Sequence, residues 1–256
     1  MKIIREIYFA FVGFFRTFGA LQFFFLRLLA GTPLIVVSRP GLVIHQVYNA
    51  GALSLVIIMV SALFVGGVLG LQGYDSLSKF NAESSVGAVA TLSLVKELGP
   101  VVTALLFAGR AGTALASEIG LMKATDQLAA MEMMAINPVN RVLVPRFLGG
   151  VISMPLLAAI FNVIGILGAY FVSVTLLGVD FGAFWEQMQL NVEPADIWEG
   201  IVKSIVFGVV ASLLAVWEGY HAIPTAEGVG RATTRTVVAT AIAVLILDFM
   251  ITAIAI

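Results

Sequence analysis

The chain has 256 residues, of which 60% are hydrophobic and only 11% are charged, and its net charge is −1 at pH 7. Soluble domains carry about 25% charged residues, so the composition excludes an ordinary soluble fold and predicts an all-α polytopic membrane protein. The near-zero net charge argues against nucleic-acid binding, and the absence of cysteine excludes disulfides and thiol chemistry.

The N-terminal segment, about 3–30, is apolar but carries Arg5, Arg16 and Arg27 at intervals of eleven residues. Because eleven residues are close to three helical turns, the arginines share one face of a helix whose remainder is rich in phenylalanine. This pattern predicts an amphipathic helix and link over residues 1–40, lying flat at the membrane interface. A re-entrant or sixth crossing is the alternative. A cleaved signal peptide is disfavoured because Arg16 interrupts the apolar core.

Five apolar stretches follow, each long enough to cross a bilayer, which takes roughly 20 residues. They cover about 51–71, 86–109, 147–177, 197–217 and 236–256. The second stretch is interrupted by Lys96-Glu97 and by Gly99-Pro100. Since proline removes a backbone donor, we expect a kink there that lines a cavity.

The distribution of lysine and arginine predicts the orientation. Eleven basic residues lie before the first stretch, between the second and third, or between the fourth and fifth, whereas only Lys79 lies in the other loops. The positive-inside rule then places the N-terminus and the segment Arg110–Arg146 in the cytoplasm, and the C-terminus on the far side.

Four ionisable residues fall inside the apolar stretches: Lys96, Glu97, Lys203 and Asp248. At about 1.5 Å per residue, all four are expected in the outer half of the membrane, where they would form a polar cavity open to the outer side. The alternative is structural, with Lys203 reaching outward to the surface and Asp248 pairing with it.

Small residues are frequent in the first two stretches. Gly66 and Gly70 have a Gly-x-x-x-Gly spacing, which permits close helix approach either within the chain or to a second copy.

The polar segment Arg110–Arg146 is expected to form a cytoplasmic loop containing a short amphipathic helix at about 125–136, which Asn137-Pro138 ends. Thr125 can serve as its N-cap, and its apolar face comprises Leu128, Met131 and Ala135. A short, methionine-rich helix in a basic loop indicates a surface for a soluble partner.

Several activities are excluded by missing motifs. The chain has no Gly-x-x-x-x-Gly-Lys-Ser/Thr loop for a nucleotide and no Gly-x-Ser-x-Gly elbow. Its only histidines, His45 and His221, do not have a metal-ligand spacing. An intramembrane enzyme is therefore weakly supported.

Eight runs of residues occur in a characteristic order: Val68–Tyr74, Lys96–Val102, Leu106–Gly112, Glu118–Thr125, Met131–Ala135, Gly219–Tyr220, Ile223–Thr225 and Arg231–Val238. Together they resemble the MlaE/YrbE family of permeases, which work with MCE proteins in phospholipid ABC transporters. The resemblance covers most of the chain and is weakest before Gln46 and across 178–200.

The resemblance implies that residues 1–256 form one permease domain of a homodimer in the bacterial inner membrane. It implies a cytoplasmic ATPase subunit (MlaF-like) that binds ATP in place of this chain, a STAS-domain protein (MlaB-like) and a periplasmic MCE hexamer (MlaD-like). The cargo would be phospholipid, moved to maintain outer-membrane lipid asymmetry. The same fold carrying a sterol or solvent-like molecule is the nearest alternative, and an intramembrane lipid-acting enzyme is a more distant one.

The resemblance also implies two sets of site residues and no cofactor or metal held by this chain. The lipid-binding set is Leu69, Gln72, Leu77, Phe80, Lys96 and Glu97. Lys96 stands where the family often has arginine, and Phe80 where tyrosine is common. The ATPase-coupling set is Thr125, Leu128, Met131, Glu132 and Met134.

Overall fold

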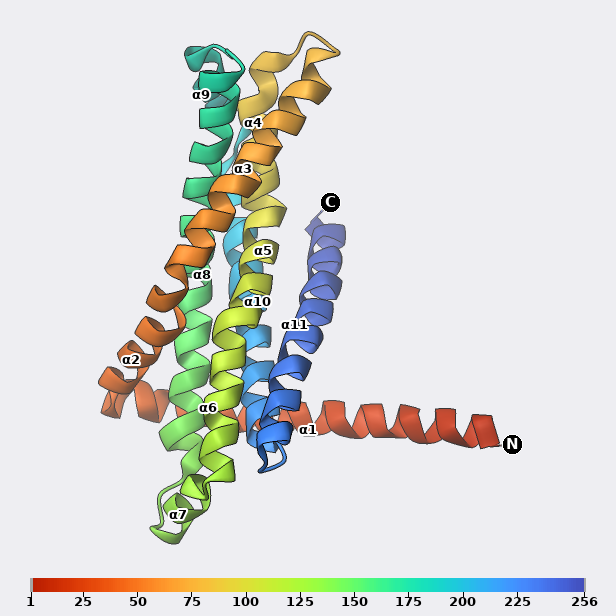
Figure 1. Cartoon of the computed structure of the whole chain (residues 1–256), viewed down its shortest axis with the longest axis vertical. Coiled ribbons are helices and arrows are strands. Elements are labelled where there is room, and N and C mark those ends of the chain that lie inside the picture. The colour runs from red at the N-terminus through yellow and green to blue at the C-terminus, as the bar shows by residue number, and fades with distance from the viewer. Residues whose placement is uncertain (1, 256) are drawn as a thin grey trace.

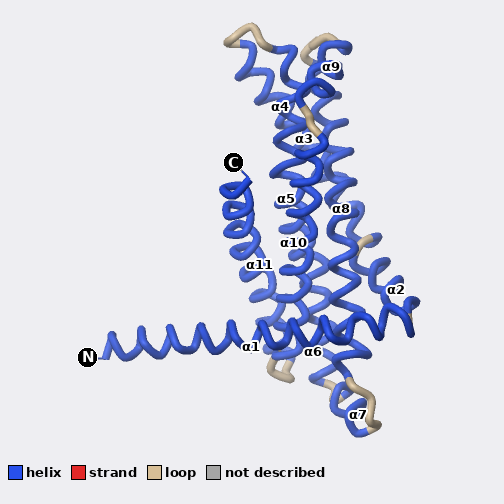
Figure 2. The backbone as a smooth tube through the Cα atoms, turned by 180° about the vertical axis from the view of Figure 1, so that it is seen from behind, coloured by secondary structure: helices blue, strands red, loops and turns tan. Residues whose placement is uncertain are grey.

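The computed structural model describes the backbone of residues 2–255 and the side chains of residues 16–254, and this part of the chain contains helices and no strand (Figure 1). The helices are α1 (Lys2–Ser38), α2 (Pro40–Ala50), α3 (Leu55–Ser78), α4 (Val86–Ser93), α5 (Gly99–Phe107), α6 (Thr113–Ala124), α7 (Gln127–Met133), α8 (Val144–Tyr170), α9 (Phe181–Asn191), α10 (Pro194–His221) and α11 (Ala226–Ala255). Figure 2 shows that loops are confined mainly to the two ends of the bundle.

Six helical stretches among the described residues are long and apolar enough to cross a membrane. They are Arg16–Ser38, Pro40–Ser78, Glu83–Ala124, Val139–Leu176, Pro194–His221 and Ala226–Ile254. The last five coincide with the five predicted stretches to within two residues at their C-terminal ends or extend beyond them, and the all-helical membrane fold is confirmed. Short α7 lies at one end of the bundle and α9 at the other (Figure 1).

The first of the six, Arg16–Ser38, belongs to α1, which lies across the bundle near the α7 end instead of along it (Figure 1). One face of α1 is buried against the bundle through Phe24, Leu28 and Ile35, and the Phe24 ring lies 5.3 Å from that of Trp217. Arg16 and Arg27 are exposed, while the side chain of Arg5 lies outside the described residues. The helix is longer than expected, reaching Ser38.

The stretch predicted at 86–109 differs most from its prediction. Pro100 does not interrupt it, because helix continues from Glu83 to Ala124 through π-helical segments at Leu94–Leu98 and Ala108–Gly112. The expectation that a loop begins at Arg110 is wrong. Arg110 lies within the helix, where its guanidinium donates to the carbonyl oxygen of Asn49 (2.6 Å) and so need not leave the membrane.

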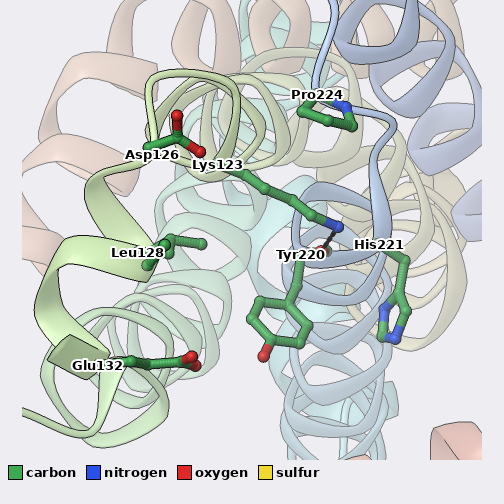
Figure 3. Close-up of a pocket in the computed structure, with 8 residues that line it drawn as sticks. Lys123, Asp126, Leu128, Glu132, Tyr220, His221 and Pro224 are labelled. Atoms are coloured by element: carbon green, nitrogen blue, oxygen red, sulfur yellow. Dashed lines mark hydrogen bonds between the residues drawn. The ribbon is translucent and has the colours of Figure 1, made fainter.

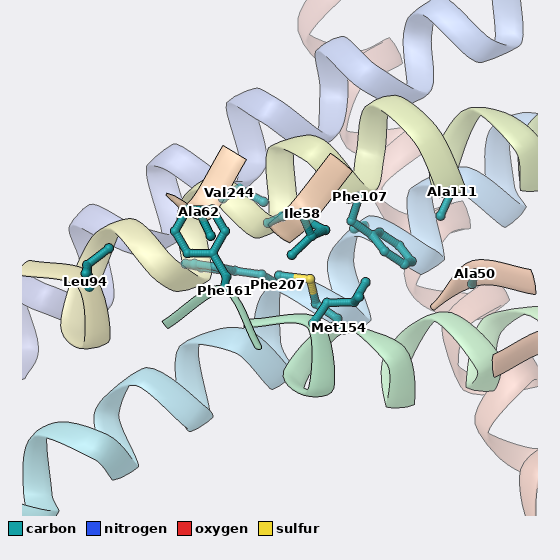
Figure 4. Packing of buried hydrophobic residues seen from close by; sticks show 13 residues of the cluster. Ala50, Ile58, Ala62, Leu94, Phe107, Ala111, Met154, Phe161, Phe207 and Val244 are labelled. Atoms are coloured by element: carbon teal, nitrogen blue, oxygen red, sulfur yellow. The ribbon is translucent and has the colours of Figure 1, made fainter. Parts of the chain in front are cut away.

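The bundle core is packed by aromatic side chains from different helices. Phe107, Phe161 and Phe207 are fully buried members of one core cluster, contributed by α5, α8 and α10 (Figure 4). The predicted close approach of small residues occurs within the chain, because a Cβ on Gly66 would collide with the carbonyl group of Gly165 on α8.

Candidate functional site

Lys203 on α10 is fully buried among charged and polar groups from three helices. Its ammonium group donates to the carbonyl oxygen of Lys96 (3.0 Å) and to Oγ1 of Thr252 (2.7 Å). It also forms ion pairs with Glu199 (3.2 Å) and Asp248 (3.4 Å). Lys203 therefore points into the bundle, and the alternative in which it reaches outward to the membrane surface is wrong.

The carbonyl group of Lys96 is available to Lys203 because of Pro100. In an α-helix this carbonyl would accept a hydrogen bond from the N–H four residues on, and proline has none. The chain forms its π-helical turn at Leu94–Leu98, just before the proline, and Lys203 supplies a donor to the freed carbonyl. The proline thus creates a point of attachment between this helix and α10 instead of a break.

The side chain of Lys96 is held by the first turns of α10. Its Nζ lies 3.0 Å from Oδ1 of Asp196 and 3.2 Å from Oε2 of Glu199. The other oxygen of Asp196 accepts a hydrogen bond from the backbone N–H of Glu193 (2.9 Å), which closes a capping box at the start of α10. Asp196 therefore fixes both the start of its own helix and the neighbouring lysine.

Asp196, Glu199 and Thr252 are members of this site that the sequence analysis missed. Asp196 lies just before the fourth predicted stretch, which begins at about 197, and was therefore expected in a loop. Yet Asp196, Glu199 and Lys203 recur at intervals of three and four residues and so share one helix face. Thr252 similarly follows Asp248 by four residues. These spacings were the available signal.

We call Lys96, Asp196, Glu199, Lys203 and Asp248 the charge cluster; it contains two cations and three carboxylates. Glu97, the residue that follows Lys96, is exposed and has no hydrogen bond or ion pair with any described residue. The cluster thus fixes the π-helical segment while leaving the Glu97 carboxylate free for a group outside this chain.

Of the remaining lipid-binding candidates, Leu69, Gln72 and Leu77 lie on the last turns of α3, which packs beside α4, and Phe80 lies in the turn that follows α3. Gln72 and Phe80 are exposed, with 80% of the Phe80 surface accessible, whereas Leu69 and Leu77 are half-buried. The α4 helix leads directly into the segment that carries Lys96 and Glu97, so all these candidates belong to neighbouring helices at one end of the bundle.

The expected amphipathic helix at the other end exists as α7, but it is shorter than 125–136 and capped differently. Thr125 is not the N-cap, because its hydroxyl donates backward to the carbonyl oxygen of Leu121 (2.9 Å) and so belongs to the end of α6. Asp126 occupies the N-cap position with a left-handed backbone (φ 56°), which aspartate tolerates.

The helix α7 ends before the expected Asn137-Pro138. The N–H of Ala135 donates to the carbonyl oxygen of Glu132, and that of Ile136 to the carbonyl oxygen of Met131, both at 2.9 Å. With Ala135 at φ 58°, this is a Schellman motif. Ala135 therefore lies outside the helix and not on its apolar face.

The apolar positions of α7 fall into two groups. Leu128 is buried and Met131 half-buried against the bundle, whereas Met133 (89% accessible) and Met134 (63%) project away from it. A pocket of about 340 Å³ lies between α7 and the end of α10, bordered by Leu128, Glu132, Tyr220 and His221 (Figure 3). Lys123 crosses it to donate to the carbonyl oxygen of Tyr220 (2.8 Å).

Fold and site together define a polytopic helical membrane protein whose polar chemistry lies within the membrane, as in transport permeases. The chain belongs to the MlaE permease family, because the family model described as Permease MlaE matches residues 43–254. The resemblance seen in the sequence is thereby confirmed.

Two relatives extend this finding. The chain is 52% identical over 244 residues to the intermembrane phospholipid transport system permease protein MlaE of Haemophilus influenzae, covering 95% of this chain and 93% of the relative. It is 39% identical over 212 residues to a probable ABC transporter permease protein of Rickettsia felis, covering 83% and 82%. The chain is therefore a multi-pass inner-membrane permease and not an enzyme.

Proposed function

We propose that the chain is the permease subunit of an ABC transporter that moves phospholipids between the bacterial inner membrane and a periplasmic ring of MCE proteins, maintaining outer-membrane lipid asymmetry. The observation that carries the proposal is the 52% identity, over 95% of the chain, to a protein named for intermembrane phospholipid transport. The intramembrane charge cluster supports it, because buried ionisable groups mark transport pathways.

The lipid would bind at the end of α3 and the neighbouring π-helical segment. Exposed Phe80 and half-buried Leu69 and Leu77 offer apolar surface to acyl chains, at about 0.8 kcal/mol for each buried methylene group. Gln72 and Glu97 offer exposed polar groups near the headgroup. Lys96 stays close to this surface because two carboxylates of α10 hold it.

The ATPase would dock on α7. The chain has no P-loop, so ATP must be bound by a partner. Met133 and Met134 present flexible apolar surface that suits a protein contact, while buried Leu128 and half-buried Met131 hold α7 against the bundle. Exposed Glu132 and Thr125 would contact the same partner.

This arrangement assigns the two sides of the membrane. The α7 end and the N-terminus would face the cytoplasm and the C-terminus the periplasm, in accord with the basic residues. Helix α1 would lie at the cytoplasmic interface, which its course across the bundle and its exposed Arg16 and Arg27 support. A second copy, a STAS-domain protein and the MCE hexamer would complete the complex.

Native mass spectrometry of the tagged chain, purified in mild detergent from cells with intact chromosomal neighbours, tests the proposal. We expect two copies of the chain, two ATPase subunits, the STAS-domain protein, an MCE hexamer and bound phospholipid. The same assembly carrying another hydrophobic molecule would instead support the alternative cargo. A lone chain with neither ATPase nor lipid would contradict the proposal.

A further inference from the structure

A second polar pocket, of about 170 Å³, lies between α2 and the helical stretch that carries Arg110. Its polar lining comprises Gln46, Asn49, Arg110 and Glu118, and Leu53 borders it with 53% of its surface accessible. Arg110 is thirteen residues from Glu97, about 20 Å along the helix toward the α7 end. The pocket is therefore separate from the proposed lipid surface on α3.

Arg110 differs from the other basic residues inside the bundle. Lys96 and Lys203 each pair with two carboxylates, whereas Arg110 forms no ion pair with any described residue. Only its Nη1 is engaged, by the carbonyl oxygen of Asn49 (2.6 Å) and the hydroxyl of Ser54 (3.4 Å). A half-buried guanidinium with unused donors favours an anionic partner.

The carboxylate that lines this pocket does not supply that partner. Glu118 lines the same pocket, but its Oε2 lies 3.2 Å from Nη2 of Arg146 on α8, which offsets its charge. Glu118 is also eight residues from Arg110, about 12 Å along the helix. The charge of Arg110 thus stays uncompensated within the described chain.

Two amide side chains beside Arg110 also lack partners. Oε1 of Gln46 is buried without a hydrogen bond, although such groups are usually satisfied. The side-chain amide of Asn49 makes no hydrogen bond to any described residue. Gly149 on α8 fixes the position of Gln46, because a Cβ on this glycine would lie 2.5 Å from that of Gln46.

We propose that Arg110, Gln46 and Asn49 bind the phosphate of a phospholipid in the half of the membrane nearest α7, as a second lipid site. Arginine matches a phosphate with paired N–H donors, and the side-chain NH2 groups of Gln46 and Asn49 can donate to its remaining oxygens, whereas the Gln46 Oε1 atom is an acceptor and does not bind the phosphate. The pocket has room for on the order of five water molecules at about 30 Å³ each, enough for a phosphate group but not a whole lipid. The acyl chains would lie outside it, along exposed Leu53.

The experiment uses the photoreactive residue p-benzoylphenylalanine in place of Leu53 in the full chain, in cells whose phospholipids are labelled with ³²P. After illumination, ³²P attached per purified chain is measured and the adduct mass is determined. A separate chain with the photoreactive residue in place of Phe80 reports on the proposed outer lipid surface. Arg110→Gln and Asn49→Leu are each combined with both probes, and Arg231→Gln is the matched control because that arginine is exposed and pairs locally with Glu227.

We expect a phospholipid adduct at position 53 that falls about tenfold in Arg110→Gln, the effect of losing a hydrogen bond to a charged group. Asn49→Leu should lower it without affecting the fold, since this side chain has no hydrogen-bond partner in the described protein. Arg231→Gln should change neither adduct, and the adduct at position 80 should persist in every variant.

Three results would overturn the inference. The first is no adduct at position 53 while position 80 is labelled, which leaves the proposed function standing. The second is an equal loss at both positions in Arg110→Gln and Asn49→Leu. The third is retention of ³²P-labelled inorganic phosphate by the purified protein without a lipid adduct, which would make the pocket a site for free phosphate. An adduct at position 53 alone would support the inference and count against the outer lipid surface.

Discussion

Replacing Lys203 by methionine is the sharpest test of the charge cluster. The substitution removes the ion pair of Asp248 and the external donor to the carbonyl group of Lys96, whereas Glu199 keeps the Lys96 ammonium at 3.2 Å. Removing one partner of a buried ion pair costs about 3–5 kcal/mol. Because Glu199 stays paired and Asp248 is 18% exposed, we expect the lower end, about 3 kcal/mol.

Thermal unfolding in one detergent, followed by the fluorescence of the three tryptophans, measures this effect. A loss of 3 kcal/mol should lower the midpoint by about 6–12 °C in a chain of this length. Lys79→Met is the control, because its ion pair with Asp75 is 66% and 75% exposed and contributes about 0–1 kcal/mol. Adding Asp248→Asn to Lys203→Met should restore about 1–3 kcal/mol by removing the unpaired charge. A midpoint for Lys203→Met equal to that of the control, or no recovery in the double variant, would refute the reasoning.

Three further predictions concern other parts of the molecule. Gly66→Ala should destabilise the fold by about 1–3 kcal/mol, because the new methyl group meets a carbonyl group of α8. Gly109→Ala has open space around the new methyl group and should leave the thermal unfolding midpoint unchanged or raised. Equal unfolding midpoints for the two variants would contradict this. Replacing Met133 and Met134 together by serine should abolish co-purification of the ATPase at an unchanged midpoint, since both are exposed; retained ATPase would count against docking on α7. Glu97→Ala should slow lipid transfer in reconstituted complexes about tenfold without loss of assembly, and undiminished transfer would exclude a role for this carboxylate.

Hydropathy predicted the membrane helices because backbone polar groups inside a bilayer must bond within their own helix. It ended the second predicted stretch just before Arg110, because the charge was interpreted as the start of a loop. The helix instead continues to Ala124, since the Asn49 carbonyl group and the pocket around it accommodate the guanidinium. Because the carbonyl group that binds Arg110 is sixty-one residues away in the chain, the sequence around Arg110 carries no local sign of this contact.

The charge cluster was predictable only in part for the same reason. Glu199 and Lys203 are four residues apart on one helix, so their pairing is local. Lys96 and Asp196 are one hundred residues apart, and only the packing of α10 against the π-helical segment brings them together. The prediction that Thr125 is the N-cap of α7 failed for a different reason. A hydroxyl between two helices can bond to either helix, and the hydrogen bond from Thr125 to the carbonyl oxygen of Leu121 places it at the end of α6.

Lys96 of the charge cluster lies on the same continuous helical stretch that leads to α7. The helical stretch Glu83–Ala124 connects the π-helical segment beside Glu97 with the start of the α7 loop, and about 40 Å of helix separates Glu97 from Ala124. Lys203 ties the π-helical segment Leu94–Leu98 to α10 and α11, so this segment cannot shift without breaking buried ion pairs or moving its neighbours with it. A π-helical segment is a common place for a functional bend, and Ala108–Gly112 interrupts the stretch between its two fixed ends. An ATPase that displaces α7 would therefore act on Glu97 through this helical stretch, across the π-helical segment Ala108–Gly112 that contains Arg110.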